Sequence, residues 1–404
     1  MLEMDEVYIC DTTLRDGRQM PGVYLTLYEC IEIARMLDEI GVDQIEVFSP
    51  SYVIKDYYLI RELNKMGLSD KLLVWHRGLR RDLEKSIGTR LDFGAVALSI
   101  ATEKGHREKK LRMTKEQIME TMCEAVTYAK DHGLYVSVNA EKSVGTEPEY
   151  LVEFANTVAD AGADRIRYCD TLGELIPHET YTVISELKRK VKIPIEFHGH
   201  DDMGMAVGNA IEAFRAGAKW LDTSVCRLGE RGGFTSLEAL LYNLYKHFNI
   251  RKYKIGKLAE LAAFVEKASG IKLPPNTPIV GRNIYRHESG IHAHGVLRDV
   301  SLYERVRAEE VGMREGSLRE KIVIGETTGR ESIVFVLREA GIDINKDDPV
   351  VSKILLKIQE QYLFGRKTSV PHEEVIELYN IISNGGKVPI TMIIEEENGD
   401  ATKS

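Results

Sequence analysis

The chain has 404 residues and a formal net charge of −9 at pH 7. This length allows a large core and more than one structural unit, and the negative charge argues against general binding to nucleic acid or to anionic membranes. No stretch is apolar enough and long enough to span a bilayer, and the acidic residues at positions 1–6 do not resemble a signal peptide. The five cysteines are scattered without a CxxC pair, which is typical of reduced thiols in a cytoplasmic protein.

Short apolar runs alternate with amphipathic patterns from residue 7 to about residue 245. Eight of these runs are expected to form strands, at 7–10, 44–48, 72–75, 93–100, 135–139, 165–169, 193–197 and 220–225. Helical patterns lie between them, for example at 27–40, 115–132, 149–161 and 181–191. Strands and helices that alternate in this way predict an α/β fold, a (β/α)8 barrel. The alternative is a doubly wound open sheet, which is disfavoured because no Gly-rich phosphate-binding turn follows the first strand.

The pattern changes after residue 250, where the chain becomes mainly helical. Helical patterns occur at 257–269, 332–340, 349–363 and 372–382, and a proline-rich run at 271–276 is typical of a linker. We therefore expect three parts: a barrel at 1–250, a linker with a subdomain dense in glycine and histidine at 251–345, and a helical subdomain with a frayed end at 346–404.

Two histidines follow the seventh expected strand. Residues two apart on a strand point to the same side, so His198 and His200 are aimed at one spot. Chemistry in a (β/α)8 barrel lies at the C-terminal ends of the strands, and Asp16 follows the first strand. We therefore predict a divalent metal site of Asp16, His198 and His200, with ligand types that accept Zn, Mn, Co or Mg. The alternatives are a hydrogen-bonded histidine pair and an aspartate that caps a turn.

Four motifs resemble those of a known enzyme family. They are DTTLRDG at 11–17, FHGHDD at 197–202, GER at 229–231 and GRNIYRHESGIHAHG at 281–295. From about residue 5 to about residue 340, the chain resembles the Claisen-condensing acyltransferases (the DRE-TIM metallolyase group), which include isopropylmalate, homocitrate, citramalate and Re-citrate synthases. The resemblance implies a catalytic barrel and a helical subdomain that reaches the partner's active site in a homodimer. It also implies an enzyme that joins an acyl-CoA, usually acetyl-CoA, to a 2-oxo acid on a divalent metal.

This reaction gives several residues an expected role. A 2-oxo acid can chelate the metal through its keto oxygen and one carboxylate oxygen, and Arg15 can stabilise the alkoxide that develops. By resemblance, His292 is the base that removes a proton from the thioester methyl group, and Tyr303 corresponds to a subdomain tyrosine. Glu141 resembles a family glutamate near the reacting groups, although it could instead be an ion-pair partner at the barrel rim.

Other residues are expected to bind the two substrates. The resemblance places CoA at the loop that contains Gly229, Glu230, Arg231 and Gly233. Glu230 could instead order the catalytic histidine, and Arg231 could be a structural ion-pair residue. Thr171 resembles a family threonine that contacts the substrate carboxylate. The further candidates for binding the 2-oxo acid are Arg18, Gln19, His76, Arg77 and Asn139.

The identity of the 2-oxo acid is predicted from charge. Arg18 stands where the family usually has glutamate, His76 matches a histidine of homocitrate synthases, and Ser137 stands where those enzymes have arginine. An apolar 2-oxo acid would leave the cations Arg18 and Arg77 unpaired, which is costly when they are buried. We therefore expect a short 2-oxo diacid: oxaloacetate, which would give citrate, or 2-oxoglutarate, which would give homocitrate. The alternative is an isopropylmalate or citramalate synthase.

Two other classes of protein share parts of this pattern. Metal-dependent aldolases and lyases, such as hydroxymethylglutaryl-CoA lyases, have the Arg-Asp and His-x-His layout but usually lack the helical subdomain with the motif from Ser289 to His292. A non-catalytic binding homologue would not need Arg15 and the metal ligands intact. We therefore expect an enzyme whose partners are acetyl-CoA and a 2-oxo acid, with no role in binding nucleic acid or membranes.

Overall fold

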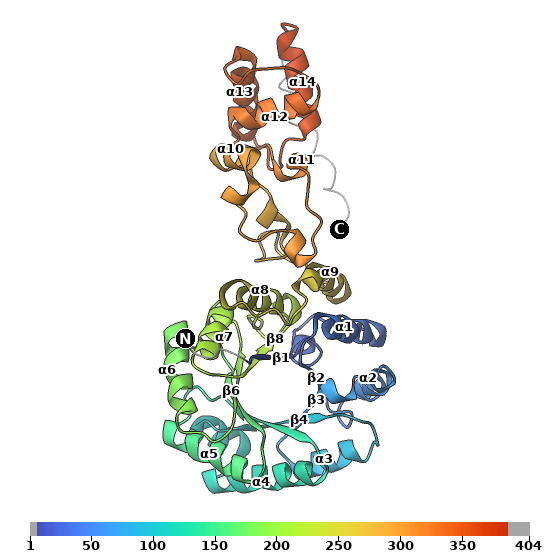
Figure 1. Ribbon diagram of the computed structural model, residues 1–404, viewed down its shortest axis with the longest axis vertical. Helices are drawn as coiled ribbons and strands as arrows, with labels where there is room; N and C mark the ends of the chain where they lie inside the picture. Colours follow the sequence, from blue (N-terminus) through green and yellow to red (C-terminus); the bar gives the residue numbers. More distant parts are fainter. Residues whose placement is uncertain (1–5, 387–404) are drawn as a thin grey trace. The chain divides into compact units, whose positions relative to one another are not determined.

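The computed structural model describes residues 6–386, which form two compact units (Figure 1). The first unit runs to residue 273 and includes 278–280, and the second contains 274–277 and continues from residue 281. Eight parallel strands of the first unit close into a barrel in chain order, with β1 paired to both β2 and β8. The strands are β1 (Tyr8–Asp11), β2 (Gln44–Phe48), β3 (Leu72–Arg77), β4 (Ala95–Ala101), β5 (Tyr135–Glu141), β6 (Arg165–Asp170), β7 (Ile195–Gly199) and β8 (Trp220–Thr223). The predicted (β/α)8 barrel is confirmed.

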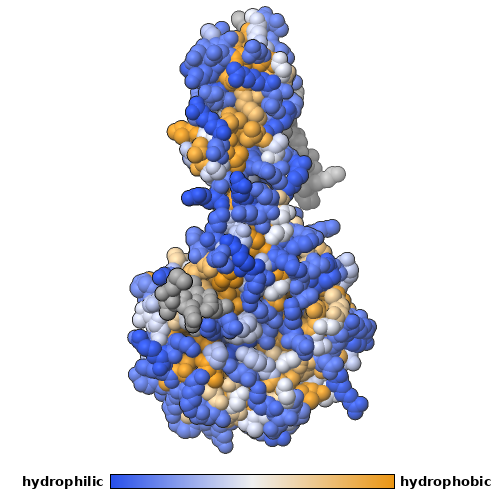
Figure 2. Space-filling view, in the orientation of Figure 1, coloured by the Kyte–Doolittle hydropathy of each residue, from blue (hydrophilic) through white to orange (hydrophobic). Residues whose placement is uncertain are grey.

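The helices of the first unit lie outside the ring of strands (Figure 1). They are α1 (Leu27–Ile40), α2 (Ile54–Lys65), α3 (Arg80–Ile87), α4 (Lys115–Asp131), α5 (Pro148–Asp160), α6 (Pro177–Lys188), α7 (Ala206–Arg215) and α8 (Leu237–Phe248), followed by α9 (Leu258–Ser269). α1 illustrates how the sequence sets their limits, because Thr26 and Glu29 form a capping box at its start and Gly41 ends it with φ of 95°. Figure 2 shows that the outer surface over these helices is largely hydrophilic on the face in view.

Seven of the eight strands differ by one or two residues from the expected limits, and two of these differences have a clear cause in the backbone. β7 begins at Ile195 instead of residue 193, because Pro194 has no N–H to donate, and it continues to Gly199. β8 ends at Thr223 instead of residue 225, because the chain turns there into a short 3-10 helix (Val225–Arg227) in which Cys226 has φ of 56°. The order and the direction of the strands are unaffected.

The second unit is built from helices around a hydrophobic core of its own. Its helices are α10 (Gly290–Arg298), α11 (Leu318–Lys321), α12 (Arg330–Glu339), α13 (Pro349–Leu363) and α14 (His372–Ser383). The core joins residues on both sides of residue 345, from Ala293 to Leu378. The finer division of the chain into three parts stays a prediction. Within residues 6–386, no helix combines the length and the apolar character needed to cross a membrane.

The core of the second unit gives a prediction about stability. Ile333 on α12 is fully buried in this core, whereas Leu356 on α13 is 55% exposed. We expect Ile333→Ala to lower the free energy of unfolding by about 2–5 kcal/mol, because it removes buried methyl groups and leaves a cavity. The matched control Leu356→Ala is expected to change it by no more than about 0.5 kcal/mol. Urea denaturation of the full chain measures both values, and equal losses would contradict this assignment of the core.

Candidate active site

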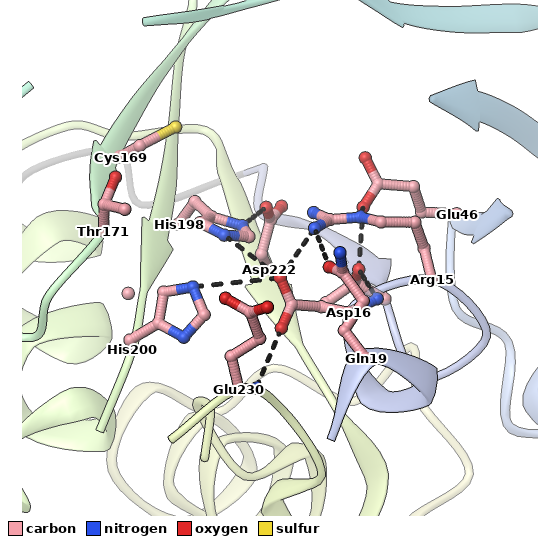
Figure 3. Close-up of polar contacts among 12 residues, drawn as sticks. Arg15, Asp16, Gln19, Glu46, Cys169, Thr171, His198, His200, Asp222 and Glu230 are labelled. Carbon is pink, nitrogen blue, oxygen red and sulfur yellow. Dashed lines mark hydrogen bonds and ion pairs between the residues drawn. The ribbon is translucent and has the colours of Figure 1, made fainter. Parts of the chain in front are cut away.

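Asp16, His198 and His200 come together at the C-terminal ends of β1 and β7. All three side chains are buried, and the nearest oxygen of Asp16 lies 3.9 Å from Nε2 of His198 and 3.8 Å from Nε2 of His200 (Figure 3). Metal–ligand bonds of about 2.0–2.2 Å place two ligands of one ion about 3–4 Å apart. The spacing of the three side chains therefore suits one shared ion.

The donor atoms of this cluster are also in the form that a metal requires. Nδ1 of His198 donates to Asp222 at 2.7 Å, which fixes the tautomer with the lone pair of Nε2 facing Asp16. Burial lowers the pKa of His198 well below its usual value and also lowers the pKa of His200, so that both rings are neutral near pH 7. Nδ1 of His200 is buried and has no hydrogen-bond partner among the described residues. The three residues fit a divalent metal.

Arg15 lies beside this cluster and is held by two carboxylates. Its Nη1 donates to Asp16 at 2.6 Å and its Nε donates to Glu46 at 2.7 Å, while Gln19 accepts a longer hydrogen bond of 3.4 Å (Figure 3). Burial acts to lower the pKa of Arg15, but the negative charges of Glu46 and Asp16 outweigh this effect. The pKa of Arg15 is therefore raised, and the guanidinium stays charged. Thr12 donates to the same oxygen of Glu46 at 2.7 Å. The result is a fixed positive charge next to the predicted metal ligands.

Arg18 and Arg77 are both paired within the chain. Nη1 of Arg18 lies 2.9 Å from each oxygen of Asp56, which is fully buried, and Nε of Arg77 lies 2.8 Å from the fully buried Asp82. The expectation that an apolar substrate would leave these two cations unpaired is therefore wrong. The sequence could not show it, because Asp56 approaches Arg18 only through the packing of α2 beside the end of β1.

His76 is a neutral member of a buried hydrogen-bond chain. Its Nδ1 donates to the carbonyl oxygen of Val74 at 2.9 Å, and its Nε2 accepts from the hydroxyl group of Ser86 at 2.7 Å. Ser86 is in turn hydrogen-bonded to Ser49. Burial lowers the pKa of His76 to about 4. The ring carries no charge near pH 7 and offers a substrate no positive charge.

Three further candidates lie at the ends of β5 and β6. Asn139 is 3% exposed, and its Oδ1 has no hydrogen-bond partner among the described residues, which suits a ligand-binding amide. Thr171 follows β6 and accepts a hydrogen bond from the backbone N–H of Lys142 at 2.9 Å. Glu141 forms an ion pair with Lys110 at 2.5 Å, which agrees with the alternative that Glu141 is an ion-pair partner at the barrel rim. Their roles in binding or catalysis stay predictions.

Asp16, His198 and His200 are called the metal-type cluster below. The loop after β8 approaches this cluster through its backbone. The N–H of Glu230 lies 3.3 Å from Asp16, while Arg231 pairs with Asp202 at 2.9 Å and donates to the carbonyl oxygen of Thr171. Gly233 has φ of 97°, and a Cβ at this position would lie 2.5 Å from the carbonyl oxygen of Arg227. This glycine is therefore required by the loop's path, and Gly229 is similarly crowded by Phe234. Contact of the loop with CoA stays a prediction.

His292 and Tyr303 lie in the second unit. Both side chains are exposed, and their ring centroids are 4.4 Å apart. The nearby His287 is buried and bonded to Glu304 at 3.2 Å. Because the two units are described separately, a role for His292 and Tyr303 in the barrel site stays a prediction.

A group of charged residues behind the site is not predicted from the sequence. Five of them are wholly buried inside the barrel and form one ion-pair network: Glu46, Arg165, Arg167, Glu196 and Asp222. Each stands within a run that was expected to be a strand. A charged residue in the middle of a buried strand needs a partner of opposite charge. Charged residues inside the expected strands are therefore the sequence feature that could have indicated this network.

Comparison with known proteins identifies the family to which this barrel belongs. A family model described as HMGL-like matches residues 6–265, and one described as Homocitrate synthase post-HMGL domain-like matches residues 279–361. A 2-isopropylmalate synthase 2 from Caldanaerobacter subterraneus subsp. tengcongensis is 39% identical, over 92% of this chain and 96% of its own length. A homocitrate synthase AksA from Methanopyrus kandleri is 38% identical, over 95% of this chain and 94% of its own.

Solved structures agree on the fold. A hydroxymethylglutaryl-CoA lyase from Pseudomonas aeruginosa has a TM-score of 0.60 and 18% identity, covering 69% of this chain and 96% of the lyase chain. A closed (β/α)8 barrel with two histidines and an aspartate at its C-terminal ends defines a class of barrel enzymes with a metal-type site. Within that class, the chain belongs to the family of 2-isopropylmalate, homocitrate and citramalate synthases. The predicted family and the prediction of an enzyme are confirmed.

The lowered pKa of His76 predicts how the stability of the protein depends on pH. An unfolded histidine titrates near pH 6.5, whereas His76 titrates at about 4 in the folded protein, so only the unfolded chain takes up this proton between those values. The contribution of His76 to stability is therefore complete above pH 6.5 and falls by up to about 3 kcal/mol as the pH drops to 4. Unfolding free energies measured across this range should decline less steeply for His76→Gln than for the wild type. The exposed His178, changed to Gln, is the control, and identical slopes for all three proteins would contradict the prediction.

Proposed function

We propose that the protein condenses acetyl-CoA with a 2-oxo acid, using a divalent metal held by Asp16, His198 and His200. The observation that carries this proposal is the buried cluster of these three residues beside the charged Arg15. The relatives named synthases for isopropylmalate, homocitrate and citramalate support the same reaction class. The metal could be Mn, Zn, Mg or Co, since two imidazoles and a carboxylate accept each of them.

Each group of the site has a part in this proposal. When bound, a divalent ion supplies Lewis-acid polarisation of the keto group. Arg15 can stabilise negative charge on the keto oxygen, because its Nη2 donates to none of the described residues while Glu46 and Asp16 hold the rest of the guanidinium. Thr171 follows β6, and Asn139 lies in the neighbouring strand β5. The hydroxyl group of Thr171 is proposed to donate to the substrate carboxylate, and Asn139 is proposed to bind the 2-oxo acid through its amide N–H groups. The loop at 229–233 is proposed to bind CoA.

The proton transfer is assigned to the second unit by resemblance to the family. His292 would remove the proton from the thioester methyl group, and Tyr303, whose ring lies against it, would assist. Glu141 is proposed to lie near the reacting groups. We further propose a cytoplasmic homodimer in which the second unit of one protomer serves the barrel of its partner.

The metal site is tested by ligand substitution and by removal of the metal. Asp16→Asn and His200→Gln are each expected to weaken Mn²⁺ binding about 100-fold or more and to abolish CoA release, because each removes a ligand. Chelation should abolish CoA release by the wild type, and added Mn²⁺ should restore it. Metal affinity is measured by calorimetry and CoA release with a thiol reagent, and the exposed His178→Gln is the control.

Undiminished CoA release by the chelated protein would contradict the metal proposal. Cleavage of hydroxymethylglutaryl-CoA without condensation would instead support the lyase class.

For the 2-oxo acid, we propose a short diacid, oxaloacetate or 2-oxoglutarate. Its support is now Arg18 alone, whose Nη1 is engaged with Asp56 while Nε and Nη2 donate to none of the described residues. The pairing of Arg18 with Asp56 and of Arg77 with Asp82 favours a second candidate, an apolar 2-oxo acid such as 2-oxoisovalerate or pyruvate, since no unpaired cation would remain.

A panel of 2-oxo acids distinguishes these two candidates. We expect the highest kcat/KM with oxaloacetate or 2-oxoglutarate and a loss of about 10-fold or more in the double variant Arg18→Met/Asp56→Asn, because a charge-assisted hydrogen bond contributes about 1.5–3 kcal/mol. The double change removes both charges of the pair, so no buried carboxylate is left alone. Turnover confined to 2-oxoisovalerate or pyruvate, and unaffected by the double change, would overturn the diacid and support the apolar substrate.

A further inference from the structure

Two arginines stand next to each other on one side of β6, inside the barrel. Arg165 and Arg167 are two residues apart, so their side chains share a face of the strand, and both are wholly buried. A buried guanidinium is tolerated only when carboxylates and hydrogen bonds surround it. The two arginines meet this requirement through different partners, and the difference is informative.

Arg165 has contacts only away from the metal-type cluster. Its Nε donates to Glu196 at 2.7 Å and its Nη2 donates to Gln44 at 2.7 Å. Its guanidinium also lies 3.8 Å from the centre of the Trp220 ring. Among the described residues, no hydrogen bond or ion pair joins these three partners to Arg15 or to the predicted metal ligands.

Arg167 contacts carboxylates that lead to the site on two sides. Its Nη1 donates to Glu46 at 2.6 Å, and the other oxygen of Glu46 accepts from Nε of Arg15. Its Nε lies 3.2 Å from Asp222, and the same oxygen of Asp222 accepts from Nδ1 of His198. Figure 3 shows Glu46 beside Arg15 and Asp222 beside His198.

We propose that Arg167 is a positioning residue that fixes Arg15 and His198 together, through Glu46 and Asp222. The proposal rests on the proposed metal site but not on the identity of the substrate. Nη1 of Arg167 donates a hydrogen bond to Glu46, while its Nε, which has no hydrogen-bond partner among the described residues, forms an ion pair with Asp222. Because both contacts come from one planar guanidinium, they limit the separation of Glu46 and Asp222, and each of these side chains in turn contacts one residue of the site. Besides Arg167 and His198, Asp222 has Glu196 as a polar neighbour, and its Oδ1 has no hydrogen-bond partner among the described residues.

The same geometry explains a second group of metal-type side chains. Cys10, Glu196 and Asp222 also offer ligand atoms within 4.8 Å of one another. Arg167 already supplies the positive charge there, with Nη2 at 3.6 Å from the sulfur of Cys10 and 3.0 Å from Glu196. The guanidinium therefore serves where a cation would otherwise be needed, and the metal is left to Asp16, His198 and His200.

The test compares Arg167→Met with the matched control Arg165→Met. Both changes remove a wholly buried arginine from β6 and both break a pair with Glu196, but only the first breaks the links to Glu46 and Asp222. The probe is Mn²⁺ alone, titrated by calorimetry into the metal-free protein, together with the visible absorption spectrum of the Co²⁺-loaded protein. Neither readout needs a substrate.

We expect Arg167→Met to weaken Mn²⁺ binding about 10-fold or more and to alter the Co²⁺ spectrum, because the partners of metal ligands typically affect affinity by 10–100-fold. Arg165→Met should stay within about 2-fold of the wild type. Arg167→Lys keeps the charge but cannot bridge two carboxylates in the same way, so it should give an intermediate loss and serves if the Met variant does not fold.

Equal losses of affinity in Arg165→Met and Arg167→Met would overturn the proposal, since both arginines would then only stabilise the barrel. Wild-type affinity in Arg167→Lys and Arg167→Met would also overturn it. Failure of the wild-type protein to bind Mn²⁺ or Co²⁺ would overturn the proposed metal site along with it. Normal metal binding without CoA release would overturn only the proposed condensation.

Discussion

Three arginines lie against three acidic side chains inside the barrel. These are Arg15, Arg165 and Arg167, with Glu46, Glu196 and Asp222. An isolated ion in such an interior costs several kcal/mol, so each group depends on the placement of the others. The same network stabilises the barrel and orients the residues at its C-terminal end. The proposed metal site and the core of the barrel therefore share one connected set of side chains.

Asp16 is a further acidic side chain next to this network. It lies between two imidazoles that burial keeps neutral and beside Arg15, which is already shared with Glu46. Asp16 and the lone pairs of two imidazoles together suit a divalent cation better than a monovalent one. Arg15 can face the substrate because its other nitrogens are held in place. In the proposed condensation, Asp16 and the two imidazoles would therefore hold the cation, and Arg15 would face the substrate.

The rim of the barrel shows that a charged residue does not by itself reveal the charge of a substrate. Arg18 and Arg77 each meet a buried aspartate of their own chain, and His76 is neutral within a chain of hydroxyl groups. The positive charge that the sequence appeared to offer a diacid is largely compensated. Nε and Nη2 of Arg18 donate to none of the described residues, and Oδ1 of Asn139 accepts from none of them. The net charge of the rim therefore does not identify the 2-oxo acid.

The alternation of apolar runs and helical patterns was enough to determine the barrel, because strand and helix periodicities are local properties of a sequence. The two-residue spacing of His198 and His200, and the rule that strand ends converge, were enough to determine the metal-type cluster with Asp16. The partners of the charged residues could not be obtained in this way. Asp56 is 38 residues from Arg18, and Glu46 is 121 residues from Arg167. Such pairs arise only when the barrel closes and its strands take their register, so the tertiary structure alone decided which charges are free to meet a ligand.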